Sequence, residues 1–153
     1  MRADLPNPRR RTDREGVTTV LLTGALLVYD GDCAFCSTSV RWLEDRFPDS
    51  FTARPYQRTD LAALGLTEAE AHAKLQWIGD VSSAATTRAQ GARAVGALLR
   101  RGGTTTGGVS GTLWRGLGAL PSIPPASWVA AAIYVVVAKN RHRLPGGTPT
   151  CKL

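Results

Sequence analysis

The segment that most constrains the fold of this chain is VYDGDCAFCSTSVRWLEDRF, residues 28–47. Two cysteines separated by two residues, Cys33 and Cys36, follow a short apolar run and precede a segment with helical periodicity. Four apolar residues of this segment follow one another at spacings of four, three and four, namely Cys36, Val40, Leu43 and Phe47. Such spacings place them on one face of a helix. The pattern therefore predicts a strand that ends just before the cysteines and a helix over 33–46 that begins with them.

The rest of the chain indicates an α/β domain. Apolar or alternating runs predict strands over 18–29, 51–57, 74–79 and 82–87. Periodic and capped segments predict further helices over 67–73, 88–101, 113–120 and 124–144. The Gly- and Thr-rich segment 102–111 predicts a flexible connector. We therefore expect a three-layer fold with a central mixed sheet of about four strands and additional C-terminal helices. A CxxC pair at the first strand-to-helix junction makes this expected fold thioredoxin-like.

Composition divides the chain into three parts. Residues 1–16 hold two prolines, many charges and no apolar periodicity, which predicts a disordered basic arm. Residues 17–147 form the single expected domain, and 148–153 a flexible C-terminal tail. The apolar run 18–29 leads directly into the CxxC without a cleavage pattern, which argues against a signal peptide. The other apolar run, 126–138, is too short to span a membrane, so we expect a buried helix and no transmembrane span.

The charge of the chain is uneven. Residues 1–80 carry ten Lys or Arg and twelve Asp or Glu, whereas 81–153 carry nine Lys or Arg and no acid. An acid-free half can attract an acidic partner, but it also fits a chain that is rich in Arg throughout. The aromatic residues of this half lie in apolar helical runs, where they are expected to be core. We therefore predict no nucleic-acid binding.

The spacing of Cys33 and Cys36 suits disulfide exchange, because one thiolate attacks and a nearby thiol then resolves the mixed disulfide. The free N–H groups and the dipole of a helix N-terminus favour a thiolate at its first residue. We expect Cys33 to be the exposed nucleophile and Cys36 the resolving thiol. Ala34 and Phe35, which carry no charge, would tune exposure and potential.

The residues before the pair have expected roles as well. Asp30, at the end of the strand, is the candidate proton acceptor for the resolving thiol. Asp32 is the expected N-cap of the helix, and Gly31 is expected to permit the backbone angles of a tight turn. The candidate catalytic residues are thus Cys33, Cys36 and Asp30, supported by Gly31, Asp32 and Phe35.

The segment YDGDCAFC, residues 29–36, closely resembles the signature of the DCC family of thiol-disulfide oxidoreductases, also known as a domain of unknown function. Asp30, Cys33 and Cys36 match its D-x-x-C-x-x-C pattern. The segment VAKNRHRLPGG, residues 137–147, is similar to the family's ending. The resemblance covers 25–147 and implies a thioredoxin-like fold and CxxC redox function. Thioredoxins themselves place a cis-proline beside the CxxC, whereas no proline lies between Gln57 and Leu120 here. We therefore expect a different substrate-binding surface or a different mechanism.

Two alternatives use the same residues differently. A non-enzymatic metal-binding module would need more ligands than one close cysteine pair, and the other candidates are His72, His142 and Cys151. A docking module would use the basic C-terminal half. Cys151 is either incidental or a third thiol that exchanges with the pair. The favoured prediction is a cytoplasmic protein-disulfide oxidoreductase without metal or cofactor, acting on a thiol- or disulfide-bearing protein or a small thiol.

Overall fold

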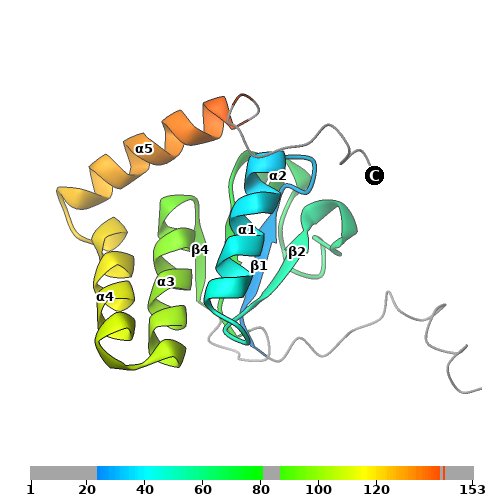
Figure 1. Ribbon diagram of the computed structural model, residues 1–153. Coiled ribbons are helices and arrows are strands. Elements are labelled where there is room, and N and C mark those ends of the chain that lie inside the picture. The colour runs from blue at the N-terminus through cyan, green and yellow to red at the C-terminus, as the bar shows by residue number, and fades with distance from the viewer. Residues whose placement is uncertain (1–23, 81–86, 142, 144–153) are drawn as a thin grey trace, which may run out of the picture.

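The computed structural model describes residues 24–80, 87–141 and 143 (Figure 1). The redox signature lies in the first of these stretches. Its elements are β1 (Leu26–Tyr29), α1 (Ala34–Arg46), β2 (Thr52–Pro55), the 3-10 turn η2 (Tyr56–Arg58), α2 (Glu68–Ala73) and β3 (Gln76–Ile78). The second stretch adds one strand and three long helices: β4 (Arg88–Gln90), α3 (Ala92–Thr106), α4 (Gly108–Ala119), the 3-10 turn η3 (Leu120–Ser122) and α5 (Ala126–Asn140).

The four strands form one mixed sheet in the order β2-β1-β3-β4. β1 pairs with β2 in parallel, with Leu26 opposite Thr52, and α1 is the crossover between them. β3 is antiparallel to both of its neighbours, β1 and β4. The predicted α/β fold with a central mixed sheet is confirmed, and the arrangement is consistent with a thioredoxin-like fold.

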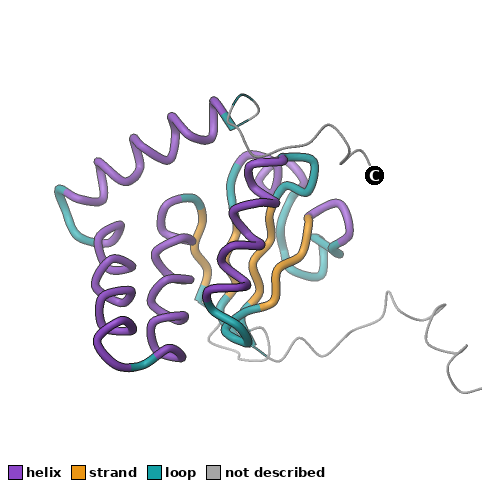
Figure 2. Tube along the Cα trace, viewed as in Figure 1, coloured by secondary structure: helices purple, strands orange, loops and turns teal. Residues whose placement is uncertain are grey.

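Side chains of β1 alternate between two apolar clusters, as a strand covered on both faces requires. Leu27 faces α1 and α3, where it packs with Phe47, Trp77 and Leu98. Leu26 and Val28 face the opposite side and pack with other residues, Leu64 and Ile78. The tube in Figure 2 shows the strands with α1 and α3 beside them. These two clusters make the predicted three layers.

The spacing of Thr67 and Glu70 predicts a capping box at the start of α2, and the structure confirms it. The hydroxyl of Thr67 accepts the backbone N–H of Glu70, and the Glu70 carboxylate accepts the backbone N–H of Thr67 at 2.9 Å. This pair satisfies two backbone donors at the helix N-terminus.

The expected flexible connector at 102–111 is wrong, because α3 continues to Thr106 and α4 begins at Gly108. Several glycines of α3 and α4 are packing positions. A Cβ on Gly102 would lie 2.5 Å from the ring of the buried Phe47. One on Gly118 of α4 would lie 2.6 Å from the carbonyl oxygen of Gly96 in α3. Small residues at these contacts let the two helix backbones approach closely, which outweighs the low helix propensity of glycine.

The fourth strand lies later than predicted. Of the predicted strand 82–87, all but Thr87 is outside the part of the chain that the structure describes. β4 spans Arg88–Gln90, where the sequence pattern predicts the start of a helix. The antiparallel pairing with β3 explains the difference, since ladder hydrogen bonds to Gln76–Ile78 favour an extended backbone over the local helical pattern.

The expected burial of the helix at 126–138 is also wrong. α5 forms, but none of its residues is buried, and Trp128 is 74% exposed. Within the described stretches, no single helix is long and apolar enough to cross a membrane. One helix pair passes that test by length and composition together, Gly108–Ser122 with Ala126–Asn140, and it is bent by 88°.

The predicted arm at 1–16 and tail at 148–153 lie outside the described residues. The division of the chain into these parts and one domain stays a prediction.

Candidate redox site

The two cysteines lie at the predicted place, the N-terminus of α1. Cys33 and Cys36 form a disulfide, with their Cα atoms 5.2 Å apart. Cys33 is itself the N-cap residue of the helix, and its sulfur accepts the backbone N–H of Cys36 at 3.2 Å. A sulfur in this position receives the partial positive charge of the helix N-terminus, which stabilises a thiolate. Phe35, between the cysteines, is half-buried.

The exposure of the two sulfur-bearing residues differs from the prediction. Cys33, expected to be exposed, is 0% exposed, whereas Cys36 is half-buried. The backbone N–H of Cys33 donates to the carbonyl oxygen of Asp30 at 3.3 Å. This turn folds Cys33 back onto the end of β1 and leaves Cys36 on the first turn of the helix.

Asp32 is not the N-cap, so that prediction is wrong. The residue is exposed, and its backbone N–H donates to Oδ1 of Asp30 at 3.1 Å. An aspartate that accepts the N–H two residues ahead makes a local turn of its own. The turn carries the chain one residue further before the helix begins, and Cys33 takes the capping position.

Gly31 is needed for close approach rather than for its backbone angles. Its φ does not lie among the positive values found at other glycines of the described chain. A Cβ at this position would lie 2.8 Å from Cβ of Pro55. The backbone N–H of Gly31 donates to Oε1 of Gln57 at 3.1 Å. Gly31 thus lets the loop before the cysteines lie directly against the end of β2.

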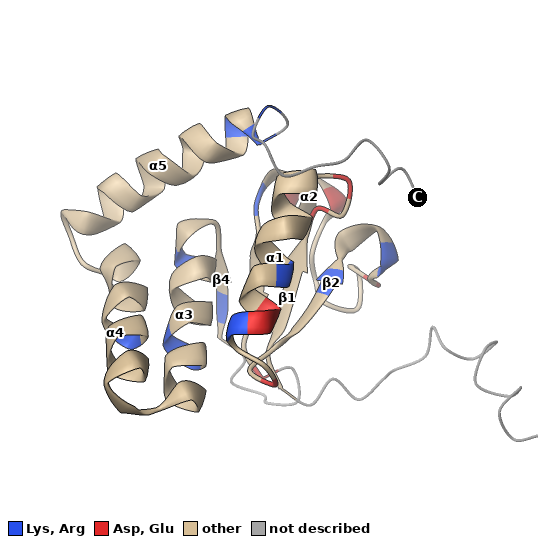
Figure 3. Cartoon of the chain, viewed as in Figure 1, with Lys and Arg blue, Asp and Glu red and all other residues tan. Residues whose placement is uncertain are grey.

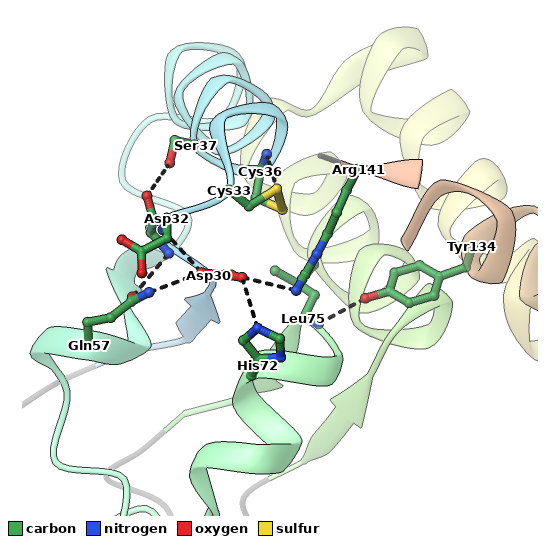
Figure 4. Close-up of polar contacts among 11 residues, drawn as sticks. Asp30, Asp32, Cys33, Cys36, Ser37, Gln57, His72, Leu75, Tyr134 and Arg141 are labelled. Atoms are coloured by element: carbon green, nitrogen blue, oxygen red, sulfur yellow. Dashed lines mark hydrogen bonds and ion pairs between the residues drawn. A yellow bond between two sulfur atoms is a disulfide. The ribbon is translucent and has the colours of Figure 1, made fainter. Parts of the chain in front are cut away.

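Asp30 is the centre of a buried polar network, which Figure 4 shows. The residue is 4% exposed because it continues the alternation of Leu26 and Val28 toward the α2 side of the sheet. Its Oδ1 accepts hydrogen bonds from the backbone of Asp32 and from Nε2 of Gln57, the latter at 3.0 Å.

The other carboxylate oxygen of Asp30 faces two cationic or titratable groups. Oδ2 lies 3.0 Å from the guanidinium of Arg141 and 4.0 Å from Nε2 of His72. The Arg141 side chain is 11% exposed. Figure 4 shows it extending from the end of α5 past the disulfide to Asp30. The C-terminal end of the chain's last described helix therefore belongs to the redox site.

Tyr134 makes a second connection between α5 and the sheet. Its hydroxyl accepts the backbone N–H of Leu75, the residue before β3, at 2.9 Å. Its ring also lies against Gly91, where a Cβ would be 3.3 Å from the ring. Tyr134 and Arg141 are two helical turns apart on α5, and both point to the body of the protein.

Tyr56 stands beside this network. Its ring meets that of His72 edge to face, with centroids 6.2 Å apart. Burial raises the pKa of the Tyr56 hydroxyl, and the negative charge of Asp30 raises it further. The phenol is therefore neutral at physiological pH and available as a hydrogen-bond donor.

Sequence reasoning missed Gln57 and Arg141. In the sequence, Arg141 belongs to a basic cluster that suits the C-terminal end of a helix. The segment 137–147, which supports the family resemblance, contains Arg141. The sequence therefore marks this residue, but it does not show that its side chain contacts Asp30.

The metal alternative gains no ligand set in the described stretches. They contain no group of three or more His, Cys, Asp or Glu side chains that could hold a metal ion. His72, which is exposed, turns toward Asp30 rather than toward the cysteines. His142 and Cys151 lie outside the described residues.

Comparison with known proteins gives one match. The family model described as DCC1-like thiol-disulfide oxidoreductase matches residues 27–147. No curated protein and no solved structure matches the chain.

Proposed function

The chain belongs to the DCC1-like thiol-disulfide oxidoreductase family, and from that premise we propose how its residues divide the work of disulfide exchange. Cys33 is the nucleophile, Cys36 resolves the mixed disulfide, and Asp30 accepts a proton. The observation that carries the proposal is the position of the Cys33 sulfur, which caps α1 and accepts the N–H of Cys36. Among the two sulfurs, this one gains most from the helix N-terminus as a thiolate.

In the reducing direction, the Cys33 thiolate attacks one sulfur of a substrate disulfide. The substrate S–S bond breaks, its other sulfur leaves as a thiolate that takes up a proton, and Cys33 is joined to the substrate. Cys36 then gives its proton to Asp30 and attacks the Cys33 sulfur. The Cys33–substrate bond breaks as the Cys33–Cys36 disulfide forms, and the second substrate sulfur leaves as a thiolate that takes up a proton. The substrate gains two electrons and the cysteine pair loses two.

Because Cys33 is buried, these reaction steps require that the site opens first. A substrate sulfur reaches Cys33 only when neighbouring side chains move aside, and Arg141 lies beside the disulfide in Figure 4. We propose that binding a thiol- or disulfide-bearing protein, or a small thiol, moves these side chains and opens this path.

Trapping of the mixed disulfide tests the assignment of the two cysteines. In a Cys151→Ser background, Cys36→Ser should form a stable mixed disulfide with oxidised glutathione, because the resolving thiol is absent. Cys33→Ser, the matched control, should form it at least about tenfold more slowly, since Cys36 lacks the capping position. Faster trapping in Cys33→Ser would assign the attack to the more exposed Cys36.

The role of Asp30 has its own test. Asp30→Asn keeps the shape and can still accept hydrogen bonds from Gln57 and Asp32, but it removes the proton acceptor. We expect the resolving step to slow and the pH–rate profile to lose its Asp30-dependent limb. An unchanged profile would leave Asp30 with the purely structural task of holding Arg141.

We also propose that the protein acts in the cytoplasm. Thiols are kept reduced there, so a CxxC pair alternates between dithiol and disulfide instead of serving as a structural disulfide. The three cysteines of the chain, two of them in the pair, support this. Fractionation of cells that express the full-length protein tests it, and recovery with an oxidising compartment would refute it.

A further inference from the structure

The helices α4 and α5 carry an apolar surface that the redox chemistry does not use. On α4, Val109, Leu113, Leu117 and Leu120 follow one another at helical spacing, and Val109 is 90% exposed. They line an apolar depression on the outside of the helix. The opposite side of α4 carries Gly111 and Gly118, which pack on α3. The stripe therefore points directly away from the body of the protein.

α5 repeats this arrangement. Tyr134 and Arg141 lie on the side that meets the sheet, whereas Trp128, Ile133 and Val136 on the other side are exposed. We call the exposed apolar residues of α4, η3 and α5 the outer surface. Large apolar side chains exposed together on neighbouring helices mark an interaction site, since burying them is favourable.

Charge indicates what covers the outer surface. Residues 81–153 contain no Asp or Glu, and Figure 3 shows only Lys and Arg on α3, α4 and α5, while the acids lie elsewhere. Two copies of the chain that met through these helices would bring positive charge against positive charge. An anionic surface would instead meet no acid on α3–α5 and would attract the exposed Lys139 and Arg143 at the end of α5.

Geometry indicates the same kind of partner. α5 has 15 residues and is about 22 Å long at 1.5 Å per residue, shorter than the apolar core of a bilayer. The 88° bend between α4 and α5 prevents the pair from crossing as one straight rod. Helices of this kind can lie in the interface, with aliphatic side chains and Trp128 inserted below the headgroups.

We propose that the outer surface docks the protein on a bilayer that contains anionic lipid. The apolar side chains enter the interface, and the exposed Lys139 and Arg143 at the end of α5 contact the headgroups. The proposal is independent of the roles assigned to the cysteines. It places the enzyme at a membrane surface through a non-spanning contact.

Vesicle flotation of the full-length protein tests the proposal. We expect binding to vesicles of equal parts phosphatidylcholine and phosphatidylglycerol, weakening as salt is added, and little binding to phosphatidylcholine alone. Ile133→Glu should lower the binding constant at least about tenfold by preventing insertion of this residue. Ala62→Glu, which adds the same charge on the opposite side of the sheet, is the matched control and should lower it only slightly.

Tryptophan emission gives a second readout. Vesicles that contain phosphatidylglycerol should shift it to shorter wavelength in the wild type and much less in Trp128→Phe. Unchanged cycling of the cysteine pair in Ile133→Glu would show that this variant is folded. Equal loss in Ile133→Glu and Ala62→Glu would reduce the contact to charge alone and overturn the proposal. Absence of vesicle binding, with a dimer that Ile133→Glu dissociates, would assign the outer surface to a second copy.

Discussion

The redox region, 24–80, and the two helices α4 and α5 differ in how they place their large apolar side chains. In the redox region, apolar residues are buried on both faces of β1, and the buried Asp30 has a partner for each oxygen. On α4 and α5, large apolar side chains are exposed, and α5 buries no residue. The first region shares a buried core with α3, whereas the second leaves its large apolar side chains exposed. The predictions below test that contrast.

The largest expected effect is on the free energy of unfolding, from truncating the core. Leu98 is fully buried between α3 and the sheet, so Leu98→Ala should destabilise the protein by about 2–5 kcal/mol. Ile133→Ala on the outer surface should change stability by no more than about 0.5 kcal/mol. Denaturant unfolding of the two variants measures the difference. Similar losses in both would contradict the contrast, because α5 would then be a core helix.

Substitutions at the contact between α3 and α4 should lower the stability of the protein nearly as much as substitutions in the core. A methyl group on Gly118 would collide with the backbone of Gly96, whereas one on Gly116 would meet nothing within 4 Å. Gly118→Ala should therefore cost about 1–3 kcal/mol of stability through overpacking. Gly116→Ala should stabilise α4 by as much as about 1 kcal/mol, because alanine is the better helix former. Thermal unfolding of the pair would refute close α3–α4 packing if both variants were stabilised.

Arg141 is the point where α5 reaches the redox site, so its loss should affect both regions. Arg141→Gln removes the cation at 3.0 Å from the buried Asp30 carboxylate and should destabilise the protein by about 1–3 kcal/mol. It should also slow thiol trapping at neutral pH, because an uncompensated carboxylate near the pair disfavours a thiolate.

Lys139→Gln is the control for Arg141→Gln, since it removes an exposed cation from the same helix end. It should leave both stability and the trapping rate close to the wild type. If Lys139→Gln changed the trapping rate as much as Arg141→Gln, the general charge of the helix end would matter, and not the contact with Asp30.

The smallest effect concerns the capping box of α2. Hydrogen bonds from Thr67 lower the pKa of Glu70 below its ordinary value. A carboxyl whose pKa is lower in the folded state stabilises the fold above its unfolded pKa, and this contribution is lost as the pH falls through the folded value. Glu70→Gln should therefore flatten the acid side of the stability profile slightly. Identical acid unfolding of the variant and wild type would argue against the capping bond in solution.

Local patterns predicted the redox region well. The strand, the CxxC and the helix that ends at Arg46 are adjacent in sequence, and the capping box of Thr67 and Glu70 needs only four consecutive residues. Such features are decided by contacts within one turn or one strand. The family resemblance rested on this same compact segment.

Long-range packing decided the features that the sequence did not reveal. Gly102 reads locally as a helix breaker, but the ring of Phe47 occupies the space where its side chain would be. Arg141 reads as a helix-end cation, but the fold brings it to Asp30. The apolar run of α5 predicts burial, because periodicity cannot tell a core helix from one that faces an external partner.

The most direct test of the account is the reduction potential of the Cys33–Cys36 pair. The full-length protein and its Cys151→Ser variant would be equilibrated in glutathione and dithiothreitol buffers and quenched with a thiol-trapping reagent. We predict one two-electron transition, equal in both proteins, at about −120 to −270 mV. A pair that stays reduced across this range, or that closes only after a chelator removes a metal, would contradict the account.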